Sequence, residues 1–153
     1  MAKHDAVIEW RSDGQFASGR YSRAHEWRFD GGAVVRASSS PSVVPLPMSD
    51  AAGVDPEEAL VASASSCHML WFLSLAHHAG LEVESYRDEA QGEMGRDERG
   101  SIAIRTIRLR PAIVFAGRQP SAEELVEPHH QSHDKCFIAN SLRSEVVVEP
   151  TQA

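Results

Sequence analysis

The sequence predicts one α+β domain that covers residues 1–153 and contains a mostly antiparallel sheet. Two observations lead to this prediction. Residues 55–80 combine helix-capping residues with a long apolar run, and shorter segments with strand-like composition lie on both sides of it. A second helix signal follows at residues 120–136, before a final β-branched segment. The resulting order of strands, long helix, strands, helix and strand is typical of an α+β domain.

The composition indicates an ordinary globular protein and excludes several classes of function. Of 153 residues, 42% are hydrophobic and 24% are charged, which is enough for one domain with its own core. The net charge of −7 argues against nucleic acid as a partner. The first ten residues contain no apolar signal segment, so we expect a cytoplasmic protein, in which the two cysteines would be reduced, redox-active or catalytic.

Three N-terminal segments are expected to form an antiparallel meander. Their boundaries are residues 6–10, residues 15–25 with a continuation to 29, and residues 33–38. Phe16 and Tyr21 would anchor the second strand, and Asp30-Gly31-Gly32 would form the hairpin turn before the third. The Ser- and Pro-rich residues 38–54 can be neither helix nor strand throughout, and we expect an ordered extended connection. The apolar side chains expected to pack there are Val43, Val44, Leu46 and Met48.

The helix at residues 55–80 is the element around which the prediction is built. Asp55 is a favourable N-cap, Pro56 suits the first helical position, and Gly80 is a natural stop. Apolar or small residues occupy nearly every face, so the helix is expected to be buried on all sides. Its length of roughly 36 Å would span a membrane, but its acidic start, its serines and His68 favour the core helix of a soluble domain.

The second half of the chain is expected to supply the rest of the sheet and a second helix. Residues 81–86 and 101–109 alternate as strands, residues 88–94 either continue the first of these or pair beside it, and residues 95–100 form a charged hairpin loop. The candidate core positions of the 101–109 strand are Ile102, Ile104, Ile107 and Leu109. Residues 111–115 extend this strand, residues 144–149 form the last strand, and residues 150–153 form a tail.

The second helix is expected to begin at Ser121 and to run toward Cys136. Ser121 and Glu124 have the spacing of a capping box, in which each side chain accepts from the other's backbone N–H. Pro128 lies inside the expected helix and should kink it or make it restart.

The two cysteines, Cys67 and Cys136, are the first candidates for chemistry. From the residues alone they could be a peroxidatic and a resolving thiol, two inert residues, or metal ligands. The metal alternative would use Cys67 or His68 together with a group at roughly helical spacing near the second cysteine. That group consists of His129, His130, His133 and Cys136. The spacing matches no standard zinc motif.

Two motifs resemble the OsmC/Ohr family of thiol-dependent peroxidases. Asp-Pro-Glu-Glu at 55–58 with Ser-Ser-Cys-His-Met-Leu at 65–70 resembles the family's central helix, and His133-x-x-Cys136-Phe-Ile-Ala-Asn140 resembles its second cysteine motif. Their order and spacing match, and the resemblance extends from about residue 10 to residue 150. It implies an intertwined homodimer whose sheets pack around long central helices, with two active sites at the interface.

The resemblance also implies roles for individual residues. Cys67 corresponds to the peroxidatic thiolate, Cys136 to the resolving thiol, and Glu57 to a glutamate that holds an arginine. The arginine itself has three candidates: Arg20, from the Gly-Arg-x-x-Arg-Ala stretch of the hydroperoxide-resistance branch, Arg23 and Arg36. A guanidinium beside Cys67 would favour the thiolate and stabilise the leaving alkoxide.

The expected function is therefore the reduction of organic hydroperoxides to alcohols in oxidative stress defence. The enzyme would need no bound cofactor or metal. An external dithiol, such as a lipoyl-type reductant, would reset it, and no nucleic acid or membrane would take part. The alternatives are a redox sensor on the same fold and a non-catalytic metal- or ligand-binding protein that uses the Cys/His set.

Overall fold

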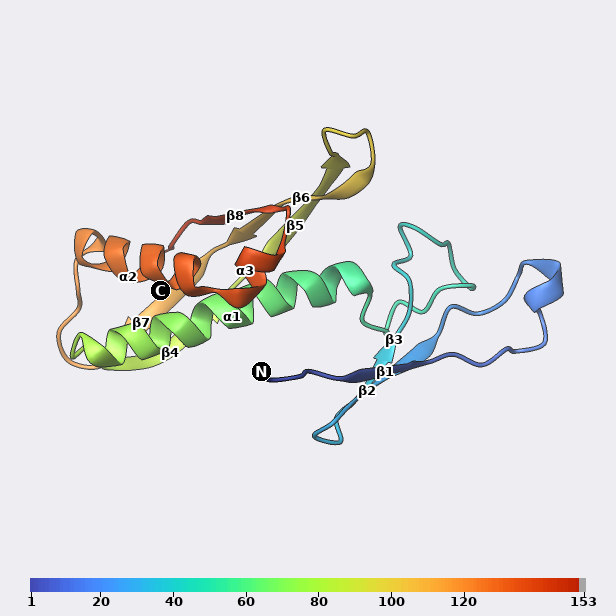
Figure 1. Ribbon diagram of the computed structural model, residues 1–153, viewed down its shortest axis with the longest axis horizontal. Helices are drawn as coiled ribbons and strands as arrows, with labels where there is room; N and C mark the ends of the chain where they lie inside the picture. Colours follow the sequence, from blue (N-terminus) through green and yellow to red (C-terminus); the bar gives the residue numbers. More distant parts are fainter. Residues whose placement is uncertain (152–153) are drawn as a thin grey trace. The chain divides into compact units, whose positions relative to one another are not determined.

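The computed structural model describes residues 1–151 and divides the chain into two compact units, Met1–Ala59 and Leu60–Ala153 (Figure 1). The long helix α1 (Pro56–His78) begins in the first unit and continues in the second. Helices and antiparallel strands occur together, so the predicted α+β class is confirmed. Of the expected C-terminal tail, residues 152 and 153 lie outside the described residues.

The first unit is built on a three-stranded antiparallel sheet in the order β1-β2-β3. Its strands are β1 (Ala6–Glu9), β2 (His25–Phe29) and β3 (Val34–Ala37). The expected turn joins β2 to β3: the backbone N–H of Phe29 donates to the carbonyl of Ala33 at 3.0 Å, and Gly32 has a φ of 85°. Since a positive φ suits glycine best, this hairpin was readable from the sequence.

The second predicted strand is misplaced, because residues 15–24 form no strand. They contain a short 3₁₀ helix, η1 (Phe16–Ser18), that ends at Gly19 with a φ of 73°. The carboxylate of Asp13 accepts from the backbone N–H groups of Gln15 at 2.9 Å and Ser22 at 2.8 Å. These local bonds compete with strand pairing, so only the expected continuation through residue 29 belongs to the sheet.

The connection at residues 38–54 is ordered but does not pack as expected. It is a series of turns rather than an extended segment, and its buried side chains are the polar Ser38 and Ser49. Val43 and Leu46 are 65% and 60% exposed, so the prediction that they pack is wrong for this chain by itself. Backbone bonds tie the segment back to β3, with the N–H of Val54 donating to the carbonyl of Arg36 at 2.9 Å.

Helix α1 begins where the capping residues predict. The carboxylate of Asp55 accepts from the N–H of Glu58 at 2.7 Å, and the N–H of Asp55 donates to the Glu58 carboxylate at 3.1 Å. This helix is long and apolar enough to cross a membrane. The core helix of a soluble protein also meets this criterion of length and composition.

The expectation that α1 is buried on all sides is wrong for the single chain. Only one stripe is fully buried, and its members recur every fourth residue: Ala64, His68, Phe72 and Ala76. On another face, Leu70 is 61% exposed. Side chains four residues apart share one helix face, so the chain fully buries a single face of its most apolar element.

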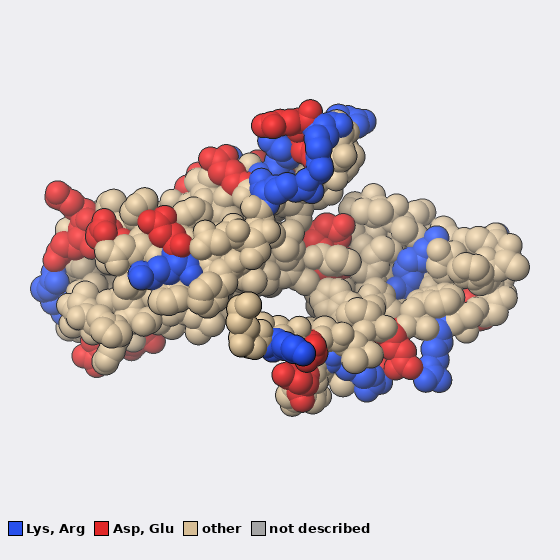
Figure 2. All heavy atoms as spheres, viewed as in Figure 1, with Lys and Arg blue, Asp and Glu red and all other residues tan. Residues whose placement is uncertain are grey.

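The second unit combines the remaining strands with three helices. β4 (Val83–Asp88) pairs with β7 (Pro111–Phe115), and β5 (Gln91–Arg96) pairs with β6 (Ile102–Leu109), which also pairs in parallel with β8 (Glu145–Val148). β4 and β5 belong to different sheets, so residues 88–94 neither continue the first of these strands nor pair beside it. β7 pairs with β4 and not in the sheet of β6, so the expectation that residues 111–115 extend the 101–109 strand is wrong as well. The charged β5–β6 hairpin loop is confirmed, and its acidic and basic side chains gather at the tip (Figure 2).

Two hydrophobic clusters hold the second unit together. In one, Ala64 of α1 packs with Ile107 and Leu109 of β6; in the other, Phe72 and Ala76 pack with Phe115 of β7. Ile107 and Leu109 were therefore correctly assigned to the core and Ile104 packs at its edge. Ile102, at the free end of the strand, is 60% exposed, and its assignment to the core is wrong.

Helix α2 (Ala122–Lys135) is followed at once by the short α3 (Phe137–Ser141). The predicted capping box is confirmed: Ser121 Oγ accepts from the N–H of Glu124 at 3.2 Å, and the Glu124 carboxylate accepts from the N–H of Ser121 at 2.8 Å. α2 runs through Pro128 without a break, so the expected restart does not occur.

Candidate functional site

The structure brings the two thiols, far apart in the sequence, into contact in the second unit. Cys67 lies in the middle of α1 and is half-buried, whereas Cys136 lies at the junction of α2 and α3 and is 1% exposed. The two side chains are close enough for Cys67 to raise the pKa of Cys136, and both are free thiols. This proximity is what the formation of a disulfide between them requires.

Aromatic packing holds the α2–α3 junction against α1. Trp71 lies one helical turn after Cys67 and therefore on the same face. It packs edge-on against Phe137 with ring centroids 5.7 Å apart, and Lys135 Nζ lies 5.6 Å from its ring centroid. Cys136 lies between these two residues in the sequence, so the contacts of Trp71 place Cys136 beside Cys67.

The environment makes Cys136 the weaker nucleophile at neutral pH. Burial raises the pKa of the Cys136 thiol, and the hydrogen bond and charge of Cys67 raise it further. The N–H of Ala139 donates to Cys136 Sγ at 3.3 Å, which offsets part of this effect. A thiol with a raised pKa stays protonated, so the accessible Cys67 is the better candidate for attack on an external molecule.

A buried pair of histidines forms the other polar contact between α1 and α2. His68 Nε2 and His129 Nδ1 share a hydrogen bond of 3.1 Å, and the ring planes are nearly parallel. Burial lowers the pKa of both His68 and His129 to about 4, and nearby His133 adds to the effect on His68. Both imidazoles are therefore neutral at physiological pH. In the sequence, the helical spacing of His129, His133 and Cys136 had already indicated that these three side chains lie on one face of α2.

The zinc alternative finds no support in this arrangement. Within residues 1–151, no group of three or more His, Cys, Asp or Glu side chains is placed so that it could hold a metal ion. His68 and His129 use one ring nitrogen each on one another, which removes those atoms from the set of possible ligands.

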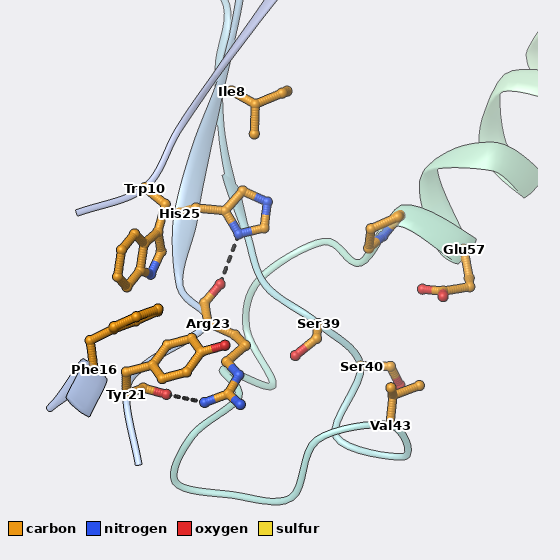
Figure 3. Close-up of a pocket in the computed structure, with 11 residues that line it drawn as sticks. Ile8, Trp10, Phe16, Tyr21, Arg23, His25, Ser39, Ser40, Val43 and Glu57 are labelled. Atoms are coloured by element: carbon orange, nitrogen blue, oxygen red, sulfur yellow. Dashed lines mark hydrogen bonds between the residues drawn. The ribbon is translucent and has the colours of Figure 1, made fainter. Parts of the chain in front are cut away.

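The first unit contains a pocket of about 480 Å³ that includes two predicted site residues, Arg23 and Glu57 (Figure 3). One wall is a cluster of three aromatic rings in mutual contact, Trp10, Phe16 and Tyr21, with centroids 4.9 to 5.8 Å apart. The aromatic wall was missed at the level of the sequence, because Phe16 and Tyr21 were assigned to a regular strand. An apolar wall beside one guanidinium suits a substrate with a hydrocarbon body and one polar group.

Three interactions hold Arg23 in this pocket. Its guanidinium lies over the Tyr21 ring, 3.6 Å from the centroid, and Nη1 donates to the Tyr21 carbonyl. Its own carbonyl accepts from His25 Nδ1 at 2.8 Å (Figure 3). His25 Nε2 in turn accepts from Trp27 Nε1 at 3.0 Å. Since a carbonyl can only accept and an indole N–H can only donate, His25 is a neutral imidazole with its proton on Nδ1.

The other two candidate arginines lie outside this pocket. Arg20 is exposed, and Arg36 forms an ion pair with Asp50. Glu57 lines the same pocket as Arg23, but the ion pairs of residues 1–151 do not include one between them. Of the predicted residues, the structure therefore groups Cys67 with Cys136 and, separately, Arg23 with Glu57. Their roles stay predictions.

Comparison with known proteins identifies the family. The family description "OsmC-like protein" matches residues 49–151. The chain belongs to the OsmC-like family. An OsmC-like protein of unknown function from Vibrio cholerae has 47% sequence identity and a TM-score of 0.96, with 99% of this chain and 100% of that chain covered. The search of curated proteins gave no match.

More distant OsmC-like structures share the fold. An organic hydroperoxide resistance protein from Elizabethkingia anophelis has 16% identity and a TM-score of 0.71, covering 100% of this chain and 96% of that chain. The organic hydroperoxide resistance protein OhrB of Bacillus subtilis has 16% identity and a TM-score of 0.66, covering 99% and 98%.

Proposed function

We propose that this OsmC-like protein is a cytoplasmic thiol peroxidase that reduces organic hydroperoxides to alcohols, with residues 1–153 acting as one domain. The observation that carries the proposal is the contact between a half-buried and a fully buried thiol, Cys67 and Cys136, on two different helices. Membership of the family supports it, and so does the fold shared with proteins named for organic hydroperoxide resistance.

The proposed reaction has two chemical steps and a reset. The Cys67 thiolate attacks the outer oxygen of the hydroperoxide, the O–O bond breaks, and the alkoxide leaves and takes up a proton to become the alcohol. Cys67 is then a sulfenic acid. The Cys136 thiol attacks its sulfur, water leaves, and a disulfide forms. An external dithiol, for example one of the lipoyl type, reduces this disulfide and is itself oxidised.

The difference in exposure supports the assignment of the two roles. Cys67 is the more accessible thiol, whereas Cys136 is buried and its pKa is raised, so it is a poor first nucleophile. We further propose that Arg23, rather than Arg20, stabilises the negative charge of the leaving alkoxide. Arg23 is the candidate that lines an apolar pocket together with Glu57.

The test is a comparison of two cysteine variants under cumene hydroperoxide and dithiothreitol. Cys67→Ser should abolish consumption of the peroxide. Cys136→Ser should keep one rapid oxidation of Cys67 but allow it to proceed to the sulfinic acid, which mass spectrometry detects. Equal loss of the first oxidation in both variants would contradict these roles. A wild-type protein that oxidises once and is not reset by any dithiol would instead support the redox-sensor alternative.

A further inference from the structure

A second cavity lies in the Leu60–Ala153 unit and is lined by neither cysteine. Its volume is about 1060 Å³, at the upper end of the range typical of small-molecule sites. Strands β7 and β8 and helix α2 supply its apolar walls: Ile113, Phe115, Leu125, Val126, Val146 and Val148. No Lys, Arg, Asp or Glu is among the lining residues. A cationic ligand would therefore find no carboxylate counter-ion in the wall.

A buried imidazole in the wall has one ring nitrogen without a partner. His129 is 5% exposed, and its Nδ1 is engaged by His68, but Nε2 has no hydrogen-bond partner. His133, which also lines the cavity, has an unpartnered Nδ1. A buried polar atom without a partner costs about 1 to 3 kcal/mol, so these positions indicate a missing hydrogen-bonding group.

The chemistry of His129 defines the group that fits. Because burial lowers the pKa of His68 and His129 to about 4, neither ring offers a positive charge to an anion. Which nitrogen of the pair carries the proton decides whether His129 Nε2 donates or accepts. A hydroxyl group both donates and accepts, so it satisfies Nε2 in either tautomer, whereas a carbonyl or a carboxylate satisfies only one.

We propose that this cavity binds an uncharged amphiphile, with a hydroxyl head on His129 Nε2 and a hydrocarbon body against the apolar side chains of β7, β8 and α2. The site does not depend on the thiol chemistry, since neither Cys67 nor Cys136 lines the cavity. Its ligand class is that of medium-chain alcohols.

The probe for this proposal is n-decanol, titrated into the full chain under reducing conditions and followed by calorimetry and by the imidazole nitrogen resonances of His129. Saturable binding that shifts those resonances is expected. n-Decane and decanoate should each bind about tenfold more weakly, the effect of one hydrogen bond. His129→Phe should weaken n-decanol binding by a similar factor, while the matched change His78→Phe, at an exposed position outside the cavity, should leave it unaltered.

A second pair of variants tests the place of binding without altering the histidine pair. Ala122 lines the cavity at the start of α2 and Glu123, its neighbour, does not. Ala122→Trp should abolish n-decanol binding, and Glu123→Trp should leave it intact. Equal affinity for n-decane, tighter binding of decanoate, absence of saturable binding, or unaltered binding to Ala122→Trp would each overturn the proposal.

Discussion

At the scale of single residues, the candidate chemistry depends on how each side chain is held rather than on which residue types are present. Arg20, Arg23 and Arg36 are equivalent in the sequence, but only Arg23 is half-buried in a pocket with Glu57. Its guanidinium rests on Tyr21, and its backbone carbonyl is fixed by His25. A preorganised cation of this kind stabilises developing negative charge without having to move during the reaction.

Replacement of Arg23 should therefore slow the first oxidation step. We expect Arg23→Met to reduce the rate of Cys67 oxidation by cumene hydroperoxide by about a hundredfold, the size of effect seen when one charge-stabilising donor is lost. Arg20→Met is the matched control at an exposed position and should stay within about twofold of the wild type. Stopped-flow measurement of the two single-turnover rates decides the matter, and a slow Arg20→Met with a normal Arg23→Met would reverse the assignment.

At the scale of elements, features set by neighbouring residues were predicted correctly more often than features set by long-range packing. The caps of α1 and α2 and the β2–β3 turn were readable because each depends on residues within a few positions of one another. The strand expected at residues 15–25 failed because side chain-to-backbone bonds of Asp13 favour turns there. Ile102 was misassigned because alternation predicts which face of a strand is buried, but not how far along the strand other elements pack against that face.

The contact between α1 and α2 was only partly predictable. Helical spacing grouped His129, His133 and Cys136 on one face, and His68 was joined to them only as a possible metal ligand, not as the hydrogen-bond partner of His129. The same limit applied to the thiols: only the resemblance to a family paired Cys67 with Cys136. Long-range contacts of this kind leave no local pattern, because the partners are distant in the chain.

The buried histidine pair should make the stability depend on pH. The pKa of each ring is about 4 in the folded state and near 6.5 when unfolded. The stabilisation is therefore fully present above about pH 6.5 and is lost as the pH falls toward 4, because the unfolded chain binds protons first. Between about pH 7 and pH 5 we expect a loss on the order of 2 kcal/mol per ring, and so about 4 kcal/mol in total, in the free energy of unfolding.

Urea denaturation at the two pH values measures this loss. His129→Phe should remove much of the pH dependence, whatever its effect on absolute stability, and the exposed His78→Phe should retain it. The same pH dependence in wild type and His129→Phe would show that other groups are responsible.

At the scale of the whole molecule, one chain leaves its central helix incompletely covered. Only one stripe of α1 is buried, Leu70 on another face is 61% exposed, and Phe137 beside Cys136 is 70% exposed. Exposed large apolar side chains on a core helix are typical of an interface. We expect an obligate homodimer that buries more than about 2,000 Å² in total.

Light scattering at micromolar concentration should give twice the chain mass of 16.8 kDa. Leu70→Glu should shift the population toward monomer, whereas a charge at an exposed position outside α1, Ser101→Glu in the β5–β6 loop, should not. A folded wild-type monomer that turns over peroxide at that concentration would rule out the dimer as a requirement.

The central claim is that Cys67 and Cys136 form one redox pair, and intact-protein mass spectrometry with peptide mapping tests it most directly. The fully reduced protein is treated with one equivalent of cumene hydroperoxide and quenched by alkylation. The account predicts the loss of two hydrogen atoms and a single peptide cross-link between Cys67 and Cys136 within one chain, reversed by dithiothreitol. Oxidised Cys67 beside an alkylated Cys136, or two untouched thiols, would contradict it.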